Sequence, residues 1–281
     1  MAERPRPVHA RLAVLGSPIS HSKSPALHRA AYDRLGLSWQ YSAVEMDGAR
    51  LGEFMGGLDA AWRGLSLTMP LKQDVLPLLD SIDEVAAITG AANTVLFDGG
   101  VRRGFNTDVG GIVRALGEHG LDGMRSGVLI GGGATAASAL IAMAQLGAAE
   151  VTVLVRRAGA ASALIELGTR LGLTVDEAPI AELAHIAGAD LVVSTVPGGT
   201  DFGVAASGAL ARHAVLLDVA YDPWPSRLAE DWLAVDGTVV HGLAMLLHQA
   251  LLQVRVFVNG DPLAPLDDEP AVLAVMRESL S

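Results

Sequence analysis

The sequence predicts an α/β protein with two domains, the second of them a doubly wound sheet. Three observations lead to this fold class. Strand-like and helix-like segments alternate along most of the 281 residues. The strand-like segments of the second half are continuous apolar runs, as a parallel sheet covered on both faces requires. Aromatic residues make up only 4% of a chain that is 51% hydrophobic, which suits layered helices and sheets better than a β-sandwich.

The first half of the chain is predicted to alternate strands with short helices. Ser24 is the expected N-cap of a helix that Pro25 opens and Gly36 ends. Pro70 begins a second, shorter helix. The sequence Asp98-Gly99-Gly100 separates the strand-like segments "NTVLF" and "VRRGF", which indicates a β-hairpin. The predicted strands before this hairpin are residues 11–16, 39–46 and 64–68.

The second half is predicted to contain a parallel sheet and its crossover helices. Its expected strands are residues 127–130, 151–155, 189–197, 214–223 and 237–242. Its expected helices are residues 134–146, 158–171, 243–258 and 268–279. We therefore expect an α/β domain formed by residues 1–107 and 243–281, and a doubly wound domain formed by residues 108–242. In this plan the C-terminal helices return to the first domain.

Composition and charge exclude several classes of protein. A net charge of −11 argues against a nucleic-acid partner, and the absence of cysteine excludes disulfides and thiol chemistry. The histidines lack the spacing of metal ligands, so we expect no metal site. Residues 127–149 carry no charge, but their glycines argue against a membrane span. The N-terminal residues lack the apolar core of a signal peptide, so we expect a cytoplasmic protein.

A glycine-rich segment lies between a predicted strand and a predicted helix. Gly131 and Gly133 occupy the first two positions of G-x-G-x-x-G, and Ala136 occupies the third. The first two positions allow a tight turn and close approach of the backbone to a pyrophosphate, while the third needs only a small side chain. The free N–H groups of the helix N-terminus suit phosphates. A glycine-rich packing turn without a ligand is the alternative interpretation.

Two arginines follow the next predicted strand. Dinucleotide-binding units that use NAD usually have an acidic residue at this point, where it binds the ribose 2′-hydroxyl. Arg156 and Arg157 are instead suited to pairing with a 2′-phosphate, which indicates NADP as the cofactor. A solvated pair of surface arginines is the alternative.

Short polar side chains gather near the ends of predicted strands in the first half. Such strand ends line the ligand crevice of an open α/β sheet. Lys72 and Asp108 are the charged residues among them. Each residue alone has a structural explanation, such as helix capping or turn formation, but the set suits a small polyhydroxylated substrate. The polar members are Ser22, Ser24, Ser66, Thr68, Asn93 and Asn106.

These residues lie in motifs that resemble those of shikimate dehydrogenases. The segments "VLGSPISHSKSPALH", "GLSLTMPLK", "GAANTV", "GFNTDVGG", "LDVAYDPWPS" and "GLAMLLHQA" have the order and spacing found in that family. The resemblance covers nearly the whole chain. It implies reversible, NADPH-dependent reduction of 3-dehydroshikimate to shikimate, with the substrate domain first and a Rossmann-type NADP-binding domain second. Monomer and homodimer are both compatible with the sequence.

The resemblance also implies roles for individual residues. Ser22 and Ser24 match a pair that binds the substrate carboxylate, and Lys72 and Asp108 match a catalytic pair that also contacts the substrate. The other implied substrate contacts are Thr68, Asn93, Tyr221 and Gln249. The implied cofactor contacts are Gly131, Gly132, Gly133, Ala134, Thr135, Arg156, Arg157, Val219 and Gly242.

The chain departs from the family pattern at two places. The family often has Asn-Val-Thr where this chain has Ser66-Leu67-Thr68, so we expect Ser66 to contact the substrate less directly. In the family's Asn-Arg-Thr loop only Arg156 matches, and Ala160 replaces a second basic residue, for which Arg157 is the candidate substitute.

Two other functions fit parts of this pattern. A quinate/shikimate dehydrogenase that uses NAD would need more room at the carboxylate and an acidic residue after the second strand of the cofactor domain. A non-catalytic NADP-binding regulator of the same fold would be expected to lack the Lys72 and Asp108 pair. Both residues are present.

Overall fold

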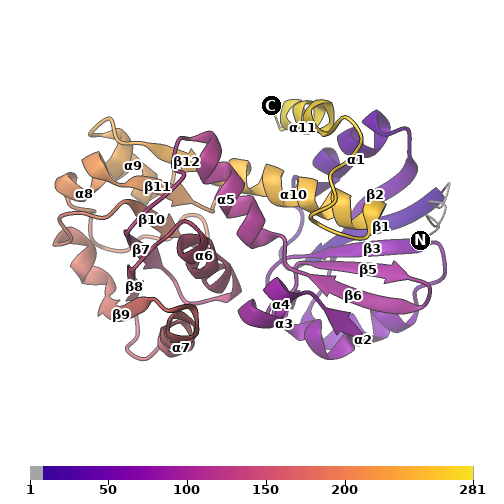
Figure 1. The fold of residues 1–281 in the computed structure, drawn as a ribbon, viewed down its shortest axis with the longest axis horizontal. Coiled ribbons are helices and arrows are strands. Elements are labelled where there is room, and N and C mark those ends of the chain that lie inside the picture. Colours follow the sequence, from indigo (N-terminus) through magenta and orange to yellow (C-terminus); the bar gives the residue numbers. More distant parts are fainter. Residues whose placement is uncertain (1–8, 281) are drawn as a thin grey trace. The chain divides into compact units, whose positions relative to one another are not determined.

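A computed structural model describes residues 9–280 and contains two compact units, each built around its own sheet (Figure 1). One unit consists of the described residues up to Thr107 together with those from Gln249 onward, and the other is Asp108–His248. The division falls inside one long helix, whereas the boundary expected from the sequence, residue 243, lies in the first turn of that helix. The predicted α/β fold class is confirmed.

The first unit contains a mixed six-stranded sheet of order β2-β1-β3-β5-β6-β4. Its strands are β1 (His9–Gly16), β2 (Ser38–Glu45), β3 (Trp62–Leu67), β4 (Ser81–Ile82), β5 (Thr94–Asp98) and β6 (Val101–Phe105). Strand β1 is parallel to β2 and β3, while β5 is antiparallel to β3 and β6, so the predicted hairpin is confirmed. This arrangement places the start of β5 beside the ends of β3 and β6 at one edge of the sheet.

The helices of this unit lie between and after its strands. They are α1 (Ser24–Arg34), α2 (Gly48–Gly56), α3 (Leu71–Asp74), α4 (Glu84–Thr89), the 3-10 turn η1 (Leu76–Leu78), α10 (Gly242–Asn259), which crosses the unit boundary, and α11 (Glu269–Glu278). Helix α11 packs on α1 (Figure 1). The prediction that Ser24 is an N-cap is wrong, because the cap position is Lys23 and Ser24 lies within the first turn. The Ser24 backbone N–H instead donates to Ser22 Oγ at 3.3 Å.

The second unit contains a six-stranded parallel sheet of order β12-β11-β10-β7-β8-β9, the doubly wound arrangement of Rossmann-type units. Its strands are β7 (Ser126–Ile130), β8 (Glu150–Val155), β9 (Thr174–Pro179), β10 (Leu191–Ser194), β11 (Val215–Asp218) and β12 (Val239–His241). Its helices are α5 (Asp108–Glu118), α6 (Ala134–Gln145), α7 (Ser162–Leu171), α8 (Gly208–His213), α9 (Arg227–Leu233) and the 3-10 turn η2 (Ile180–Ala184).

Several details of the second unit differ from the sequence-based expectation, and helices α5, α8 and α9 were not among the expected helices. The edge strand β9 was not predicted, because its sequence "TVDEAP" carries two acidic residues in place of an apolar run. Helix α7 begins at Ser162 and not at residue 158, because residues 156–161 form a turn with Gly159 at φ 78°. Strand β11 ends at Asp218, five residues earlier than expected, because the following residues form a loop.

Each sheet is covered by apolar side chains from its own unit. In the first unit Leu51, Leu65 and Leu71 are fully buried in one core. In the second, Trp232 is fully buried and its indole N–H donates to the Ala214 carbonyl at 2.8 Å. Because the only hydrogen-bond donor of the indole ring has a partner, the large apolar ring can be buried without leaving a polar group unpaired. The two cores therefore hold the strand ends of each unit in place.

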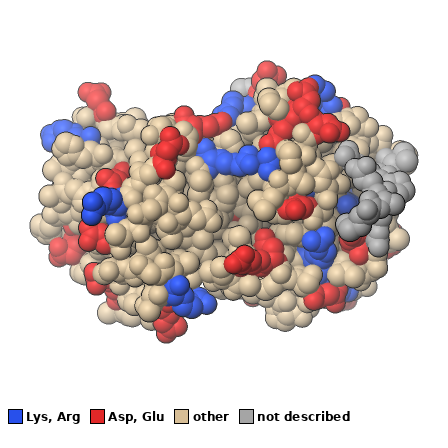
Figure 2. All heavy atoms as spheres, viewed as in Figure 1, with Lys and Arg blue, Asp and Glu red and all other residues tan. Residues whose placement is uncertain are grey.

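On the face shown in Figure 2, acidic and basic side chains lie interspersed over the surface. The net charge of −11 is therefore not gathered into one acidic patch on this face. Across residues 9–280, no helix is both long and apolar enough to cross a membrane. The uncharged run at residues 127–149 is divided between β7 and α6.

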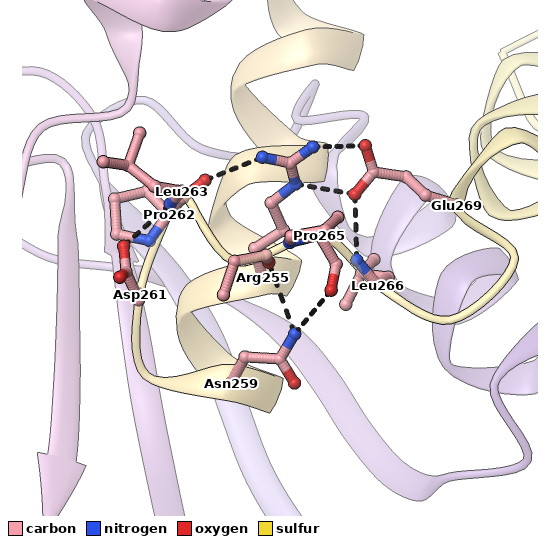
Figure 3. A network of polar contacts seen from close by, with 9 residues as sticks. Arg255, Asn259, Asp261, Pro262, Leu263, Pro265, Leu266 and Glu269 are labelled. Atoms are coloured by element: carbon pink, nitrogen blue, oxygen red, sulfur yellow. Dashed lines mark hydrogen bonds and ion pairs between the residues drawn. The ribbon is translucent and has the colours of Figure 1, made fainter.

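A buried ion pair fastens α10 to the C-terminal segment (Figure 3). The Arg255 guanidinium donates to both carboxylate oxygens of Glu269, with Nε 2.6 Å from Oε2, and its Nη1 donates to the Pro262 carbonyl at 3.0 Å. The same Oε2 accepts from the Leu266 backbone N–H at 3.0 Å. The two side chains are only 7% and 16% exposed. Since the charges are desolvated, the pair is sensitive to loss of one partner.

We predict that Glu269→Gln lowers the free energy of unfolding by about 3 kcal/mol, because it leaves the buried Arg255 charge without its bidentate partner. The matched control is Glu230→Gln, which breaks the pair with Arg227, where both side chains are about half exposed. For that variant the expected loss is about 0.5 kcal/mol or less. Urea denaturation measures both, and equal losses would contradict the prediction.

Candidate functional site

Backbone hydrogen bonds bring three polar segments together at one edge of the first sheet. Thr68 N donates to Leu15 O at 2.9 Å, Leu67 N donates to Asn93 O at 2.8 Å, and Asn93 N donates to Phe105 O at 3.0 Å. The residues that follow β3 and β6 and the residue that precedes β5 are therefore neighbours. This edge joins Thr68, Asn93 and the segment that leads to Asp108, as the sequence analysis expected for strand ends.

The hydrogen bonds of Asn93 establish the orientation of its side-chain amide at this edge. It is 1% exposed, and its Oδ1 accepts from the Thr107 backbone N–H at 2.9 Å. Because a backbone N–H can only donate, this bond establishes which end of the amide is oxygen. The Nδ2 end then donates to Thr107 Oγ1 at 2.9 Å and to Gln249 Oε1 at 3.3 Å. The Asn93 and Gln249 side chains are therefore in direct contact.

The serines of the first loop lie at the start of α1. Ser22 is half-buried, and its Oγ accepts from Ser24 N. This bond leaves the Ser22 hydroxyl able to donate elsewhere. Ser24 is buried in the first turn of the helix, which Pro25 continues. Unsatisfied N–H groups at a helix N-terminus favour anions, so the segment suits a carboxylate.

Lys72 and Asp108 lie on different elements. Lys72 is half-buried on α3, and its carbonyl accepts from Ala92 N at 2.8 Å, which ties α3 to the residue before Asn93. Asp108 is 3% exposed and is the first residue of α5. Asn106, two residues earlier, donates from Nδ2 to Thr89 Oγ1 and to Ala91 O, both at 3.0 Å. Its amide therefore fastens the chain just ahead of Asp108.

Ser66 differs from the other candidate residues in the hydrogen bonds that its side chain makes. It is 2% exposed, accepts from the Tyr41 hydroxyl at 2.7 Å, and donates to Gln253 Oε1 at 2.9 Å. Sequence reasoning missed both partners. The available signal was in α10, where Gln253 stands four residues after Gln249 on the same helical face within an otherwise apolar run.

The glycine-rich turn follows β7 and precedes α6, as predicted. Gly131 has φ 112°, and a Cβ there would lie 2.5 Å from Thr195 Oγ1, so only glycine fits without a shift. Gly133 precedes the first residue of α6 with open space where a side chain would be. Ala136 is fully buried, as the third position of the motif requires. Ala134 and Thr135 form the first turn of α6.

This turn lies at the point where the order of the second sheet reverses. Thr195, which follows β10, donates from its backbone N–H to Ile130 O at 2.9 Å. Strands β7 and β10 are neighbours whose connections run in opposite directions, and ligands of doubly wound sheets bind outside the carboxyl ends of such strands. The glycine-rich turn is therefore placed to hold a pyrophosphate.

Arg156 and Arg157 are both exposed in the turn that follows β8. The Glu177 carboxylate on β9 shapes this turn, because it accepts from Gly159 N and from Ala161 N, each at 2.7 Å. Sequence reasoning missed Glu177 because β9 itself was not predicted. With no acidic side chain directly after β8, the turn suits a 2′-phosphate better than a ribose hydroxyl.

The loop after β11 carries Val219 and Tyr221, both half-buried. Asp218 closes the base of this loop, since it accepts from Ser226 Oγ and, at 3.2 Å, from Ala220 N. Burial raises the pKa of Asp218 above its ordinary value. A Cβ on Gly242 would lie 2.4 Å from Val219 O, so the two residues implied to lie near the nicotinamide are packed backbone against backbone.

The candidate residues thus form two groups, one in each unit. Of the residues implied to bind the substrate, the first unit contains Ser22, Ser24, Thr68, Lys72, Asn93 and Gln249. Asp108 and Tyr221 belong to the second, together with every residue implied to bind the cofactor. Among residues 9–280, no group of three or more histidine and acidic side chains is arranged to hold a metal ion.

Comparison with known proteins gives relatives along the whole chain. A family model described as the shikimate dehydrogenase substrate binding domain matches residues 14–95. A shikimate dehydrogenase (NADP(+)) of Methanothermobacter thermautotrophicus is 31% identical over 262 residues, which cover 90% of this chain and 92% of the relative.

Solved structures are similar over almost their full length. A shikimate 5-dehydrogenase from Mycobacterium fortuitum is 39% identical with a TM-score of 0.82, and the match covers 98% of this chain and 99% of the other. The enzyme from Thermus thermophilus, solved in complex with NADP(H) and shikimate, is 29% identical with a TM-score of 0.80, and the match covers 96% and 99% of the two chains.

A Rossmann-type unit joined to an α/β unit with a polar sheet edge defines the class of dinucleotide-dependent oxidoreductases with a separate substrate domain. The identity to the relatives is high enough, over enough of the chain, to narrow this class. The chain belongs to the shikimate dehydrogenase family. The resemblance inferred from the motifs is thereby confirmed.

Burial next to the candidate site also predicts a pH effect on stability. His28 is fully buried, stacked 4.0 Å from the Tyr41 ring, and burial lowers its pKa from 6.5 to about 3. Between these values the unfolded chain binds a proton that the folded chain does not. Stability therefore falls as the pH falls through this window, by up to about 1.4 kcal/mol per pH unit.

We predict that His28→Gln makes the dependence of unfolding free energy on pH shallower between pH 6 and pH 4, because it removes this one proton. Chemical denaturation at a series of pH values measures the slope. His213, which is exposed at the end of α8, provides the matched control, and His213→Gln should leave the slope unchanged. Identical slopes for wild type and His28→Gln would contradict the assignment.

Proposed function

We propose that this protein catalyses the reversible, NADPH-dependent reduction of 3-dehydroshikimate to shikimate, a step of chorismate and aromatic amino-acid biosynthesis. The observation that carries the proposal is family membership over nearly the whole chain, with Lys72 and Asp108 both retained. The related enzyme of known structure from Thermus thermophilus holds both NADP(H) and shikimate. The small-molecule substrate is thus a cyclic, polyhydroxylated carboxylate.

In this proposal the substrate carboxylate is held by Ser22 and Ser24 at the start of α1. Neutral hydroxyls and the positive end of a helix dipole balance the negative charge without a buried counter-ion. The ring hydroxyls are held by Thr68, Asn93 and Gln249, with Tyr221 as a further contact. The Asn93 orientation supports this role, because its amide is already fixed before any ligand binds.

Lys72 and Asp108 are proposed to perform the proton chemistry. When bound, NADPH supplies a hydride to the ketone carbon of the substrate. Negative charge then develops on the carbonyl oxygen, where the Lys72 ammonium stabilises it electrostatically. Asp108 orients Lys72 and accepts a hydrogen bond from a ring hydroxyl, and the pair supplies the proton that completes the alcohol.

The second unit is proposed to bind NADP through residues 131–135, the arginine pair, Val219 and Gly242. The backbone N–H groups at the start of α6 would hold the pyrophosphate, and Arg156 with Arg157 would pair with the 2′-phosphate. The exposed arginines and the absence of an acidic residue directly after β8 support NADP over NAD. Both observations also speak against an NAD-dependent quinate/shikimate dehydrogenase.

The experiment that tests the function follows absorbance of NADPH during reduction of 3-dehydroshikimate, with 3-dehydroquinate and NADH as comparisons. We expect turnover with 3-dehydroshikimate and NADPH. Preference for NADH and 3-dehydroquinate would favour the quinate enzyme, and no turnover with any combination would favour a regulator.

For Lys72→Ala we expect kcat to fall by about 10²–10⁴, because the developing oxyanion loses its charged partner. Shikimate affinity, measured by calorimetry, should change by only a few-fold, since the carboxylate contacts remain. Gln73→Ala is the control, an exposed neighbour on the same short helix. Turnover of Lys72→Ala within tenfold of wild type would refute the catalytic role.

For Arg156→Ala we expect KM for NADP⁺ to rise about tenfold or more, because a charge-assisted hydrogen bond to phosphate is lost. KM for NAD⁺ should stay within twofold, as NAD⁺ has no 2′-phosphate. The control is Arg170→Ala, an exposed arginine in the last turn of α7. An equal rise in KM for both cofactors would contradict recognition of the phosphate by Arg156.

A further inference from the structure

We propose that Gln253 is a positioning residue for substrate binding, which holds Asn93 in place, and that Ser66 is a relay to Gln253 and not a substrate ligand. The proposal rests on the proposed function, because it assigns how the substrate edge of that enzyme is kept in shape. It concerns residues of the first unit only.

Gln253 makes four hydrogen bonds while only 2% exposed. Its Nε2 donates to Asn93 O at 3.0 Å and to Thr94 Oγ1 at 3.1 Å. Its Oε1 lies 2.9 Å from Ser66 Oγ and 3.2 Å from His28 Nε2. Since a backbone carbonyl can only accept, the bond to Asn93 O determines which end of the amide is nitrogen. Both the nitrogen and the oxygen of the Gln253 side-chain amide therefore have hydrogen-bond partners within the protein.

The fixed amide in turn sets the direction of its neighbours' protons. Gln253 Oε1 can only accept, so the single hydroxyl proton of Ser66 points to Gln253. The Tyr41 hydroxyl then donates to Ser66 Oγ at 2.7 Å. His28 carries its proton on Nε2, and Nδ1 accepts from the Tyr32 hydroxyl at 3.0 Å. Ser66 has no second proton to offer a substrate hydroxyl.

Gln253 reaches Asn93 by two routes. One is the direct bond to the Asn93 carbonyl, which also accepts from Leu67 N. The other passes through Thr94, whose Oγ1 accepts from Gln253 and donates to Asn93 Oδ1 at 2.8 Å. Together the routes restrain both the backbone and the amide of the residue proposed to hold a ring hydroxyl. Losing them loosens Asn93 without removing any group that touches the substrate.

The test is Gln253→Met, which keeps approximate side-chain volume and removes all four hydrogen bonds. We expect KM for shikimate to rise about tenfold, kcat to stay within about threefold, and KM for NADP⁺ to stay within twofold. A general loss of folded protein would lower kcat and leave both KM values unchanged. Gln253→Glu is the second variant, because it keeps the acceptor for Ser66 and His28 but loses the donors to Asn93 and Thr94. It should raise KM for shikimate to a similar extent.

A double-mutant cycle with Ser66→Ala separates a relay from a ligand. If Ser66 acts only through Gln253, Ser66→Ala raises KM for shikimate about twofold to threefold in the wild type and not at all in Gln253→Met. An equal rise in both backgrounds means that Ser66 contacts the substrate independently, which overturns the relay assignment.

Tyr32→Phe is the matched control, since it removes a buried hydroxyl from the far end of the same network, where Tyr32 donates to His28 Nδ1. KM for shikimate should be unchanged. A rise equal to that of Gln253→Met would show that any loosening of the core weakens binding and would overturn the proposal. Calorimetry and turnover assays with the wild type distinguish failure of the proposed function from failure of the positioning role. If the wild type neither binds shikimate nor turns it over, the proposed function is refuted. If the wild type is normal and KM is unchanged in both Gln253 variants, only the positioning role is refuted.

Discussion

The antiparallel course of β5 is the constraint on which the substrate side of this protein depends. Because β5 runs against β3 and β6, its first residue meets the ends of both neighbours. Asn93 therefore connects several segments: its backbone is hydrogen-bonded to Leu67 and Phe105, and its side-chain amide is hydrogen-bonded to Thr107 and Gln249. In an all-parallel sheet the residue before this strand would lie at the opposite edge, away from Thr68 and Lys72.

The two units are proposed to hold an anion in different ways. In the second unit the glycine-rich turn and the start of α6 offer backbone N–H groups. The sequence there needs small residues, because large side chains would block these groups. In the first unit the hydroxyls of Ser22 and Ser24 add to the start of α1, and a buried layer of Tyr41, Ser66 and Gln253 is hydrogen-bonded to Asn93. Buried polar groups must be paired, so such a layer is rigid when complete.

Much of the fold followed from local pattern. The hairpin at residues 94–105, the strand before Gly131 and the helix after it were predicted within a residue or two, because apolar runs and glycine turns are local signals. The edge strand β9 was missed because an exposed strand needs no apolar run. The assignment of Ser24 as the N-cap was wrong, because the cap position is Lys23 and the Ser24 backbone N–H donates to Ser22 Oγ. Residue preferences at helix ends do not predict this hydrogen bond.

By itself the sequence determined the family, the order of the two units and the identity of the candidate polar and glycine residues, since motifs and apolar periodicity are written in consecutive positions. Only the tertiary structure decided that Ser66 faces Tyr41 and Gln253, that Glu177 shapes the arginine turn, and that Asp218 closes the loop of Tyr221. The contacts of Ser66 and Glu177 depend on strand order and side-chain direction, and those of Asp218 depend on the path of the loop that follows β11. Hydrogen bonds need partners within about 3 Å, and that proximity arises only when the chain is packed.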